Sequence, residues 1–377
     1  MASLAAHWVD RVLPEVGLRQ WVVTVPWPRR WLLARRPNLA RGVLAVAIRT
    51  VARFLTRRAA ARGHPTGRTG SITVVQRFGS ALNLNLHFHI LCLDGVYVRQ
   101  AEGLRFVRDR LVTTEEVAGL VVELATRAER WLSRQGFGAD DGEEEHCDDD
   151  DALPLMQAAS VQGRSAVAGG RRARRTQVHR GRAYALPPRC AAWGGYTLHG
   201  GVSVGGRDAG GRERLCRYLA RPALARTRLQ ETPAGLIRVT FKRPWADGTA
   251  GVTFTPLEFV ERLAALVPPP RAHLVHYHGV LAGRSAWRRE VVPDPPASIP
   301  AHRPPLSTRA TPSRSARYLT WAELLWRVFA VDGWRCPNCG RRMTLRAVPW
   351  PRATLRILNG LDAAAARAPP DAVAVPA

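Results

Sequence analysis

The strongest constraint on the fold is a stretch of nine residues, 82–90 (LNLNLHFHI), in which apolar and polar side chains alternate without a break. A period of two is typical of a β-strand, because successive side chains point to opposite faces of a sheet. The apolar face predicts contact with a hydrophobic core. The opposite face would carry Asn83, Asn85, His87 and His89.

This polar face predicts a metal site. Two imidazoles two residues apart lie on neighbouring pleats, so both rings can contact one cation, and the two carboxamides can orient the rings or contact a phosphate. The competing interpretation is a pair of hydrogen-bonded histidines on a half-exposed sheet, which is the commoner outcome for an isolated H-x-H. A second H-x-H, His276 and His278, lacks the polar alternation and ranks below the first.

Periodicity elsewhere predicts a mixture of helices and strands. Thr113 and Glu116 form a capping box before a strongly amphipathic segment, Asn38 is a candidate helix cap, and Asp94-Gly95 is a hairpin signal. We expect helices over 3–13, 38–61, 113–132, 209–221, 256–267 and 320–330. We expect strands over 19–25, 71–78, 82–93, 96–99, 104–108, 196–204, 236–242, 251–255 and 272–278.

Composition divides the chain into four segments. Residues 1–135 hold the N-terminal helices and the histidine strand, and residues 186–292 hold the second group of strands and helices. Between them, residues 136–185 form an acidic and then Gly/Arg-rich linker, with nine carboxylates at 140–151 and no base. Residues 293–377 contain a Pro/Arg-rich linker, a CPNC segment and a tail expected to be disordered.

The charge of the chain favours a polyanionic partner. Its 56 basic and 30 acidic residues give a net charge of +26, which suits DNA or RNA. Lys242 is the only lysine, so GC-rich codon usage accounts for part of this arginine excess. No stretch reaches the ~18 consecutive apolar residues of a membrane span, no secretory signal is recognisable, and six cysteines are too few for a disulfide scaffold. We therefore expect a cytoplasmic protein.

Six segments resemble rolling-circle transposases of the HUH class (His, hydrophobic, His), in particular insertion-sequence family ninety-one and its common-region relatives. The segments follow the family's order, and the resemblance as a whole covers the chain from about residue 5 to residue 343. The segments are QRFGSALNLNLHFHILCLDGVYV (76–98), LCRYLARP (215–222), FKRPWADGT (241–249), FTPLEFVERLAALVPPPR (254–271), YHGVLAGRSAWR (277–288) and CPNCGRRM (336–343).

The resemblance implies a reaction and a nucleophile. HUH enzymes cut single-stranded DNA with a tyrosine, leaving a 5′-phosphotyrosine and a free 3′-hydroxyl, and Tyr218 matches that position. Arg214 and Arg221 lie four residues before it and three after it, where guanidinium groups would favour a phenolate and bind the scissile phosphate. Relatives with two tyrosines carry the second one four residues later. Pro222 stands there, so the chain resembles the single-tyrosine branch.

The resemblance also implies a cofactor, Mg²⁺ or Mn²⁺, held by the two strand histidines and a third ligand. Gln76 lies in the matching segment, but alternation places it with Ile72 and Val74 on what we expect to be an apolar face. Asp94 and His199 remain alternative third ligands.

Two observations concern zinc. Cys336 and Cys339 form half of a zinc knuckle, and the sequence has no second CxxC to complete four ligands, so a structural Zn²⁺ is possible but not favoured. Relatives often carry a cysteine-rich zinc-binding region before the first helix. The sequence begins about where that region would end, and we expect a variant without it.

Together these observations predict a transposase with an α+β fold. A central antiparallel sheet would carry His87 and His89, with helices on one face and the helix of Tyr218 on the other. The partner would be single-stranded DNA at transposon ends and target, in a bacterial cytoplasm at the nucleoid, with the oligomeric state left open. An inactive remnant that only binds DNA or RNA, and a hydrolytic metal-dependent nuclease, remain alternatives. Basic-aromatic stretches at 27–31 and 321–334 suit either single-strand binding or core packing.

Overall fold

The computed structural model describes residues 2–138, 152–177, 186–293, 321–336 and 338–343. The chain forms two units, which divide after Arg317. In its described part, the second unit contains one helix, α9 (Trp321–Phe329), followed by a short turn-rich segment. All other elements belong to the first unit.

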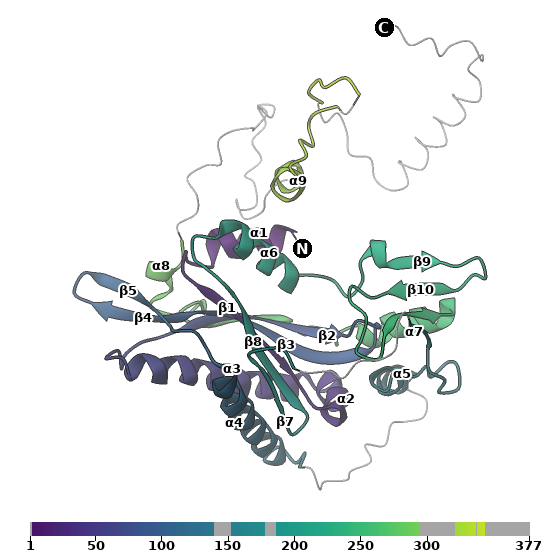
Figure 1. Ribbon diagram of the computed structural model, residues 1–377, viewed down its shortest axis with the longest axis horizontal. Helices are drawn as coiled ribbons and strands as arrows, with labels where there is room; N and C mark the ends of the chain where they lie inside the picture. Colours follow the sequence, from purple (N-terminus) through teal and green to yellow (C-terminus); the bar gives the residue numbers. More distant parts are fainter. Residues whose placement is uncertain (1, 139–151, 178–185, 294–320, 337, 344–377) are drawn as a thin grey trace. The chain divides into compact units, whose positions relative to one another are not determined.

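The first unit is built on a six-stranded sheet in which every strand is antiparallel to its neighbours (Figure 1). The strand order is β12 (Val275–Gly279), β2 (Gly70–Phe78), β3 (Leu84–Leu93), β1 (Leu18–Thr24), β8 (Tyr196–Val204) and β7 (Cys190–Trp193). The histidine strand β3 therefore lies inside the sheet, between β2 and β1. The prediction of an α+β fold with a central antiparallel sheet is confirmed.

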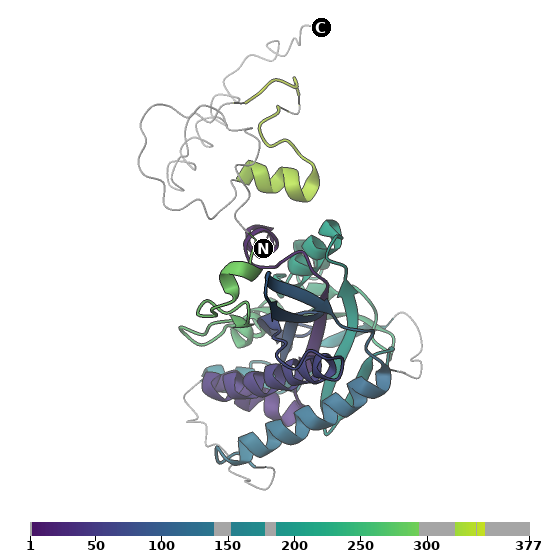
Figure 2. The ribbon, with the colours of Figure 1, turned by 90° about the vertical axis from the view of Figure 1, so that its left-hand side faces the viewer.

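Helices cover both faces of this sheet (Figures 1 and 2). On one face, α3 (Pro37–Ala60) and α4 (Thr114–Ser133) pack on a core that includes Phe88 and Ile90 of β3. On the other face, α1 (Ala2–Arg11) and α6 (Ala209–Leu219) pack on a core that includes Leu91 and Leu93. Because β3 is buried on both sides, its sequence becomes continuously apolar after His89.

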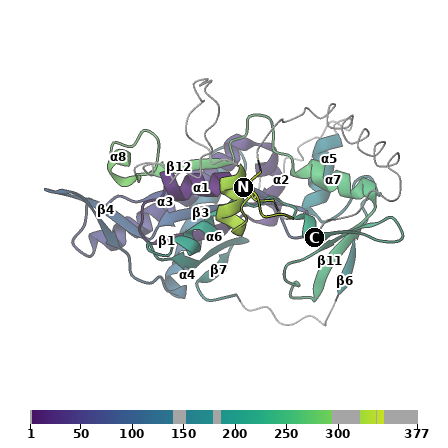
Figure 3. The same cartoon turned by 90° about the horizontal axis from the view of Figure 1, so that it is seen from above.

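A smaller lobe lies at one end of the unit, opposite the hairpin of β4 (Gly95–Gln100) and β5 (Gly103–Arg108) (Figure 3). Its four antiparallel strands follow the order β6 (Arg174–Gln177), β11 (Thr249–Phe254), β10 (Ile237–Thr240) and β9 (Leu229–Glu231). The helices α5 (Ala152–Val161) and α7 (Pro256–Leu266) belong to this lobe. The remaining helical turns are α8 (Arg288–Val291) and a 3-10 turn at Arg226–Arg228.

The helix α2 (Trp27–Arg35) attaches this lobe to the sheet. The indole of Trp27 donates to the carbonyl of Val161, and that of Trp31 donates to the carbonyl of Pro154, over 3.2 and 3.3 Å. Both acceptors lie in α5. In this basic-aromatic stretch the tryptophans therefore hold two helices together, as expected for packing residues.

The capping box at Thr113 and Glu116 is present, with both reciprocal hydrogen bonds. The cap predicted at Asn38 is wrong. Arg36 occupies the cap position of α3, because Pro37 fits the first turn, where its missing N–H costs nothing.

Two predictions around β3 are wrong. The strand begins at Leu84 instead of residue 82, because Leu82 has a positive φ of 55° in the turn that precedes it. Asp94-Gly95 does not connect paired strands either, since β4 pairs with β5 and not with β3. The Asp94 carboxylate instead accepts two hydrogen bonds from the buried guanidinium of Arg19.

The segment expected to be a linker, 136–185, contains α5 and β6 in its described part. Its acidic run lies outside the described residues, as do most of residues 293–377. The helix that carries Tyr218 ends at Leu219, two residues before the predicted end.

Candidate active site

The candidate site lies on the face of the sheet that α1 and α6 cover. His87 and His89 project to this face from β3, and the centroids of their rings are 4.9 Å apart. Both side chains are almost fully buried, with 8% and 2% of their surface exposed. The strand alternation thus brings the two imidazoles together under a covering helix.

Tyr218 lies in the last turn of that helix, α6. Its ring meets the ring of His89 edge-on, with 5.7 Å between the centroids. Leu215 and Leu219 are buried against the sheet, which leaves Tyr218 at the edge of the helix with 40% of its surface exposed. A macromolecule can therefore approach the phenol, although the histidines beneath it are covered.

One arginine lies beside the phenol, and a second lies one helical turn before it in the sequence. The guanidinium of Arg221 lies 4.3 Å from the centroid of the Tyr218 ring, although Arg221 follows the end of the helix instead of belonging to it. Its Nε atom is buried and has no hydrogen-bond partner in the described residues. Arg214 lies one helical turn before Tyr218 and is exposed. The Arg221 guanidinium therefore lies beside the phenol, whereas the Arg214 guanidinium points back toward Gly210 in the first turn of α6.

Burial keeps both imidazoles neutral. It lowers the pKa of His87 to about 4, a shift that the positive charges of Arg221 and Arg30 increase and the hydrogen bond to the Asn85 carbonyl opposes. Burial also lowers the pKa of His89 to about 2, with His87 and Arg221 contributing. A neutral imidazole is the form that binds a metal ion.

Gln76 lies directly opposite His87 in the register of β2 and β3. Its amide nitrogen donates to the carbonyl of Leu219 over 3.0 Å, and its Oε1 atom is buried without a partner in the described residues. The expectation that Gln76 shares a face with Ile72 and Val74 is correct. That face is also the histidine face, apolar along most of its length and polar at this end.

These side chains fit a divalent cation. His87 Nδ1 lies 2.9 Å from the backbone carbonyl of Asn85, and donation there leaves the lone pair on Nε2. His89 Nδ1 lies 2.5 Å from the carboxamide of Gln20, and its Nε2 is buried without a partner in the described residues. With Gln76 Oε1, the set is two imidazole nitrogens and one carbonyl oxygen, and the imidazoles favour Mn²⁺ or softer ions over Mg²⁺.

The alternative third ligands lie elsewhere. Asp94 pairs with Arg19, and His199 lies on β8, separated from β3 by β1. In the part of the chain that the structure describes, no three side chains of His, Cys, Asp or Glu gather as a metal site. Among the described side chains, the candidate third ligand here is therefore the carboxamide of Gln76.

The two asparagines predicted beside the histidines occupy different environments. Asn85 belongs to β3, and its Oδ1 atom is buried without a partner among the described residues. Asn83 precedes the strand, and its side chain lies against Gly79 in the turn. Asn83 is therefore not part of the polar row on the sheet.

The second H-x-H lies on the opposite face. Trp8 of α1 donates to the Tyr277 hydroxyl, so the flanking His276 and His278 point away from α1. They line a separate cavity of about 590 Å³ beside α3. They do not join the site of His87 and His89.

In the second unit, Cys336 and Cys339 lie in a tight turn. Hydrogen bonds from the backbone amides of Cys339 and Asn338 lower the pKa of the Cys336 thiol. Within the described residues no further ligand joins the pair.

Sequence reasoning missed Gln20, which touches His89 from β1. The available signal was a polar residue inside an otherwise apolar strand, RQWVVTV, but strand pairing is needed to show which histidine it meets.

Comparison with known families identifies the class of protein. The sequence model of a family described as "Putative transposase" matches residues 70–289, more than half of the chain, and the chain therefore belongs to this transposase family. The match includes β2, β3 and α6. No curated protein and no solved structure matches the chain. None of the helices in the described ranges combines the length and apolar character that crossing a bilayer requires.

Proposed function

We propose that this transposase cleaves and rejoins single-stranded DNA through a covalent bond to Tyr218, with help from a divalent metal ion. The observation that carries the proposal is the exposed phenol beside two buried, neutral imidazoles. DNA strands can approach the tyrosine, and the histidines lie where a cation could act on the same phosphate.

The Tyr218 oxygen would attack a backbone phosphorus and form a 5′-phosphotyrosine. The bond from phosphorus to the 3′-oxygen would break, and the proton lost by the phenol would be matched by the proton gained at the 3′-hydroxyl. Arg221 would favour the phenolate and, with Arg214, bind the phosphate oxygens. When bound, Mg²⁺ or Mn²⁺ supplies Lewis-acid polarisation of the phosphate. Rejoining is the reverse attack by a 3′-hydroxyl.

His87, His89 and Gln76 would hold the cation. Support comes from the unpartnered Nε2 of His89 and Oε1 of Gln76, both buried at this place within the described part of the chain. The Leu219 carbonyl fixes the amide nitrogen of Gln76, so its oxygen is the free end. The amide nitrogen of Gln20 lies 2.5 Å from Nδ1 of His89, and a half-turn of this carboxamide would present its oxygen to Nδ1–H and orient the ring with Nε2 toward the cation.

Incubation with end-labelled hairpin oligonucleotides of randomised sequence and Mn²⁺ tests the proposal. We expect an adduct that survives denaturation and maps by mass spectrometry to the peptide of Tyr218. Tyr218→Phe should abolish the adduct. Tyr277→Phe is the matched control, because it removes a hydroxyl on the same face that only receives a hydrogen bond from Trp8.

The His87→Ala, His89→Ala double variant should lose the stimulation by Mn²⁺ and retain DNA binding. An adduct that persists in Tyr218→Phe refutes the nucleophile. Cleavage without an adduct indicates a hydrolytic nuclease, and binding without cleavage indicates an inactive remnant.

A further inference from the structure

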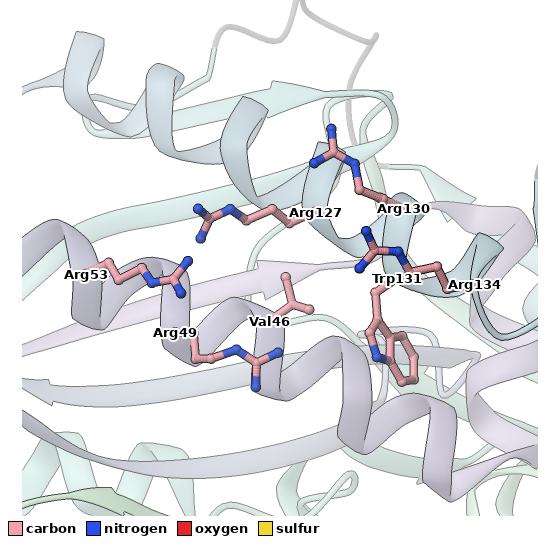
Figure 4. Close-up of a pocket in the computed structure, with 7 residues that line it drawn as sticks. All are labelled: Val46, Arg49, Arg53, Arg127, Arg130, Trp131 and Arg134. Atoms are coloured by element: carbon pink, nitrogen blue, oxygen red, sulfur yellow. The ribbon is translucent and has the colours of Figure 1, made fainter.

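A pocket lined by five arginines lies between α3 and α4, on the side of the sheet opposite to Tyr218. Its volume is about 250 Å³, and Figure 4 shows it in close-up. Arg49 and Arg53 come from α3, one helical turn apart, and face the space between the helices. The other lining residues are Val46, Arg127, Arg130, Trp131 and Arg134.

Contacts between the antiparallel helices define both ends of this pocket. At one end Glu123 of α4 accepts from Arg57 of α3 over 2.9 Å and pairs with Arg127 over 3.0 Å. At the other end the Trp131 ring lies directly on Gly42, where an added Cβ would come within 1.9 Å of it. The helices are thus held together on either side of the arginines.

Among the described residues, the central arginines have no acidic partner. In the described residues no ion pair or side-chain hydrogen bond involves Arg49, Arg53, Arg130 or Arg134. The dipole of α4 favours cations in its last turn and accounts for Arg130 and Arg134. It does not account for Arg49 and Arg53, which lie in the middle of α3 and face like charges. No described carboxylate relieves this repulsion, so the pocket offers positive charge to an anion.

We infer that this pocket, the α3–α4 arginine pocket, binds the phosphate backbone of duplex DNA. Guanidinium groups match phosphate oxygens with paired donors, and two facing rows of them suit a chain of phosphates better than one isolated anion. Single-strand sites also need exposed aromatic rings for base stacking. Among the described residues that line the pocket, the one aromatic ring, Trp131, is packed on Gly42 and is not free to stack.

The location of the pocket gives this surface a role separate from cleavage. The sheet lies between the pocket and Tyr218, so a duplex held there does not compete with a strand at the phenol (Figure 1). The inference requires that the partner is DNA, and it does not require that Tyr218 is a nucleophile.

The inference is tested by the binding of a blunt, labelled 20-base-pair duplex to the full chain. Fluorescence anisotropy measures this binding between 50 and 300 mM salt. The test variant replaces Arg49, Arg53, Arg130 and Arg134 with Ala. The control replaces four exposed arginines elsewhere, whose side chains likewise form no ion pair or hydrogen bond within the described ranges: Arg105, Arg108, Arg284 and Arg289. Both variants lose the same charge.

We expect the test variant to bind the duplex at least tenfold more weakly at 150 mM salt. Its slope of log Kd against log salt should fall by about 3 to 4, at roughly 0.9 for each phosphate that the protein no longer neutralises. The control variant should change by less than threefold. Circular dichroism checks that the variants fold, and Arg→Lys at the same four positions should restore most of the salt slope.

Equal losses of affinity in the two variants would overturn the inference, because binding would then follow net charge alone. A larger loss for single-stranded than for duplex DNA, or equal affinity for polyglutamate, would overturn it in favour of another ligand. Tyr218→Phe should bind the duplex like the wild-type chain. A failure of adduct formation therefore counts against Tyr218 as the nucleophile, and a failure of duplex binding counts against the α3–α4 arginine pocket.

Discussion

The rings of His89 and Tyr218 meet edge to face with 5.7 Å between their centroids, although one belongs to an inner strand and the other to a helix that covers it. The distance between the two rings depends on the position of α6 on the sheet. The hydrogen bond from Gln76 of β2 to the carbonyl of Leu219, the residue next to Tyr218, holds the end of α6 against the sheet. The oxygen of the same glutamine lies beside His87 and has no hydrogen-bond partner among the described residues.

Replacing Gln76 should separate these two roles. Gln76→Leu removes the oxygen and the hydrogen bond, so we expect at least a tenfold loss of Mn²⁺-stimulated adduct and a loss of about 1 kcal/mol in the free energy of unfolding. Gln76→Glu keeps an oxygen ligand and should recover much of the response to Mn²⁺. Adduct yield against Mn²⁺ concentration measures this. An unchanged Mn²⁺ response in Gln76→Leu would exclude Gln76 as a ligand.

The stability of the metal-free protein should fall with pH below about 6.5. The pKa values of His87 and His89 are lowered to about 4 and about 2, whereas the unfolded chain has ordinary values near 6.5. Between pH 6.5 and 4 the unfolded state therefore binds more protons, and the free energy of unfolding decreases by up to about 1.4 kcal/mol per pH unit for each histidine. Above pH 6.5 the contribution is complete.

Urea unfolding in chelator between pH 7.5 and 5 measures this slope. The His87→Gln, His89→Gln double variant should show a flatter dependence, because other histidines titrate equally in both proteins. Parallel slopes in the two proteins would show that these imidazoles do not control the acid sensitivity.

Gly42 should tolerate a methyl group only when Trp131 is replaced by a smaller side chain. Gly42→Ala forces the indole away from α3 and should destabilise the protein by about 1–3 kcal/mol, although alanine is the better helix former. In a Trp131→Leu background the same change should stabilise by up to about 1 kcal/mol. Thermal unfolding of the four proteins measures the change of sign, and the same sign in both backgrounds would disprove the packing of Trp131 on Gly42.

The buried ion pair of Arg19 and Asp94 should contribute to the fold and not to metal binding. Asp94→Ala leaves an uncompensated guanidinium with 1% exposure, and we expect a loss of about 3–5 kcal/mol in the free energy of unfolding. The Arg19→Met, Asp94→Leu double variant should recover much of it. Isothermal titration with Mn²⁺ should give unchanged affinity in the double variant, and a large loss there would return Asp94 to the candidate ligands.

Local periodicity was enough to predict the face that His87 and His89 share and the helix of Tyr218, because both follow from spacing within one element. It did not predict α2 and α5, whose residues lack a clear apolar stripe. The contacts of Gln20 and Gln76 depend on which strands pair and in what register, and tertiary packing determines that register. An alternating polar row also predicted a strand beginning at residue 82, where the chain instead turns.

Because β3 is buried on both sides, its even-numbered residues pack in the core under α3, and its odd-numbered residues include the two histidines under α6. A three-nucleotide insertion inside β3 would add one residue and reverse the faces of the residues on one side of it. Imidazoles would then point into the core under α3, and aliphatic side chains would lie under Tyr218. One such event would remove stability and chemistry together, whereas the same lesion in the preceding turn would leave both alternations intact. Gene copies damaged in this strand should therefore lose protein and activity simultaneously.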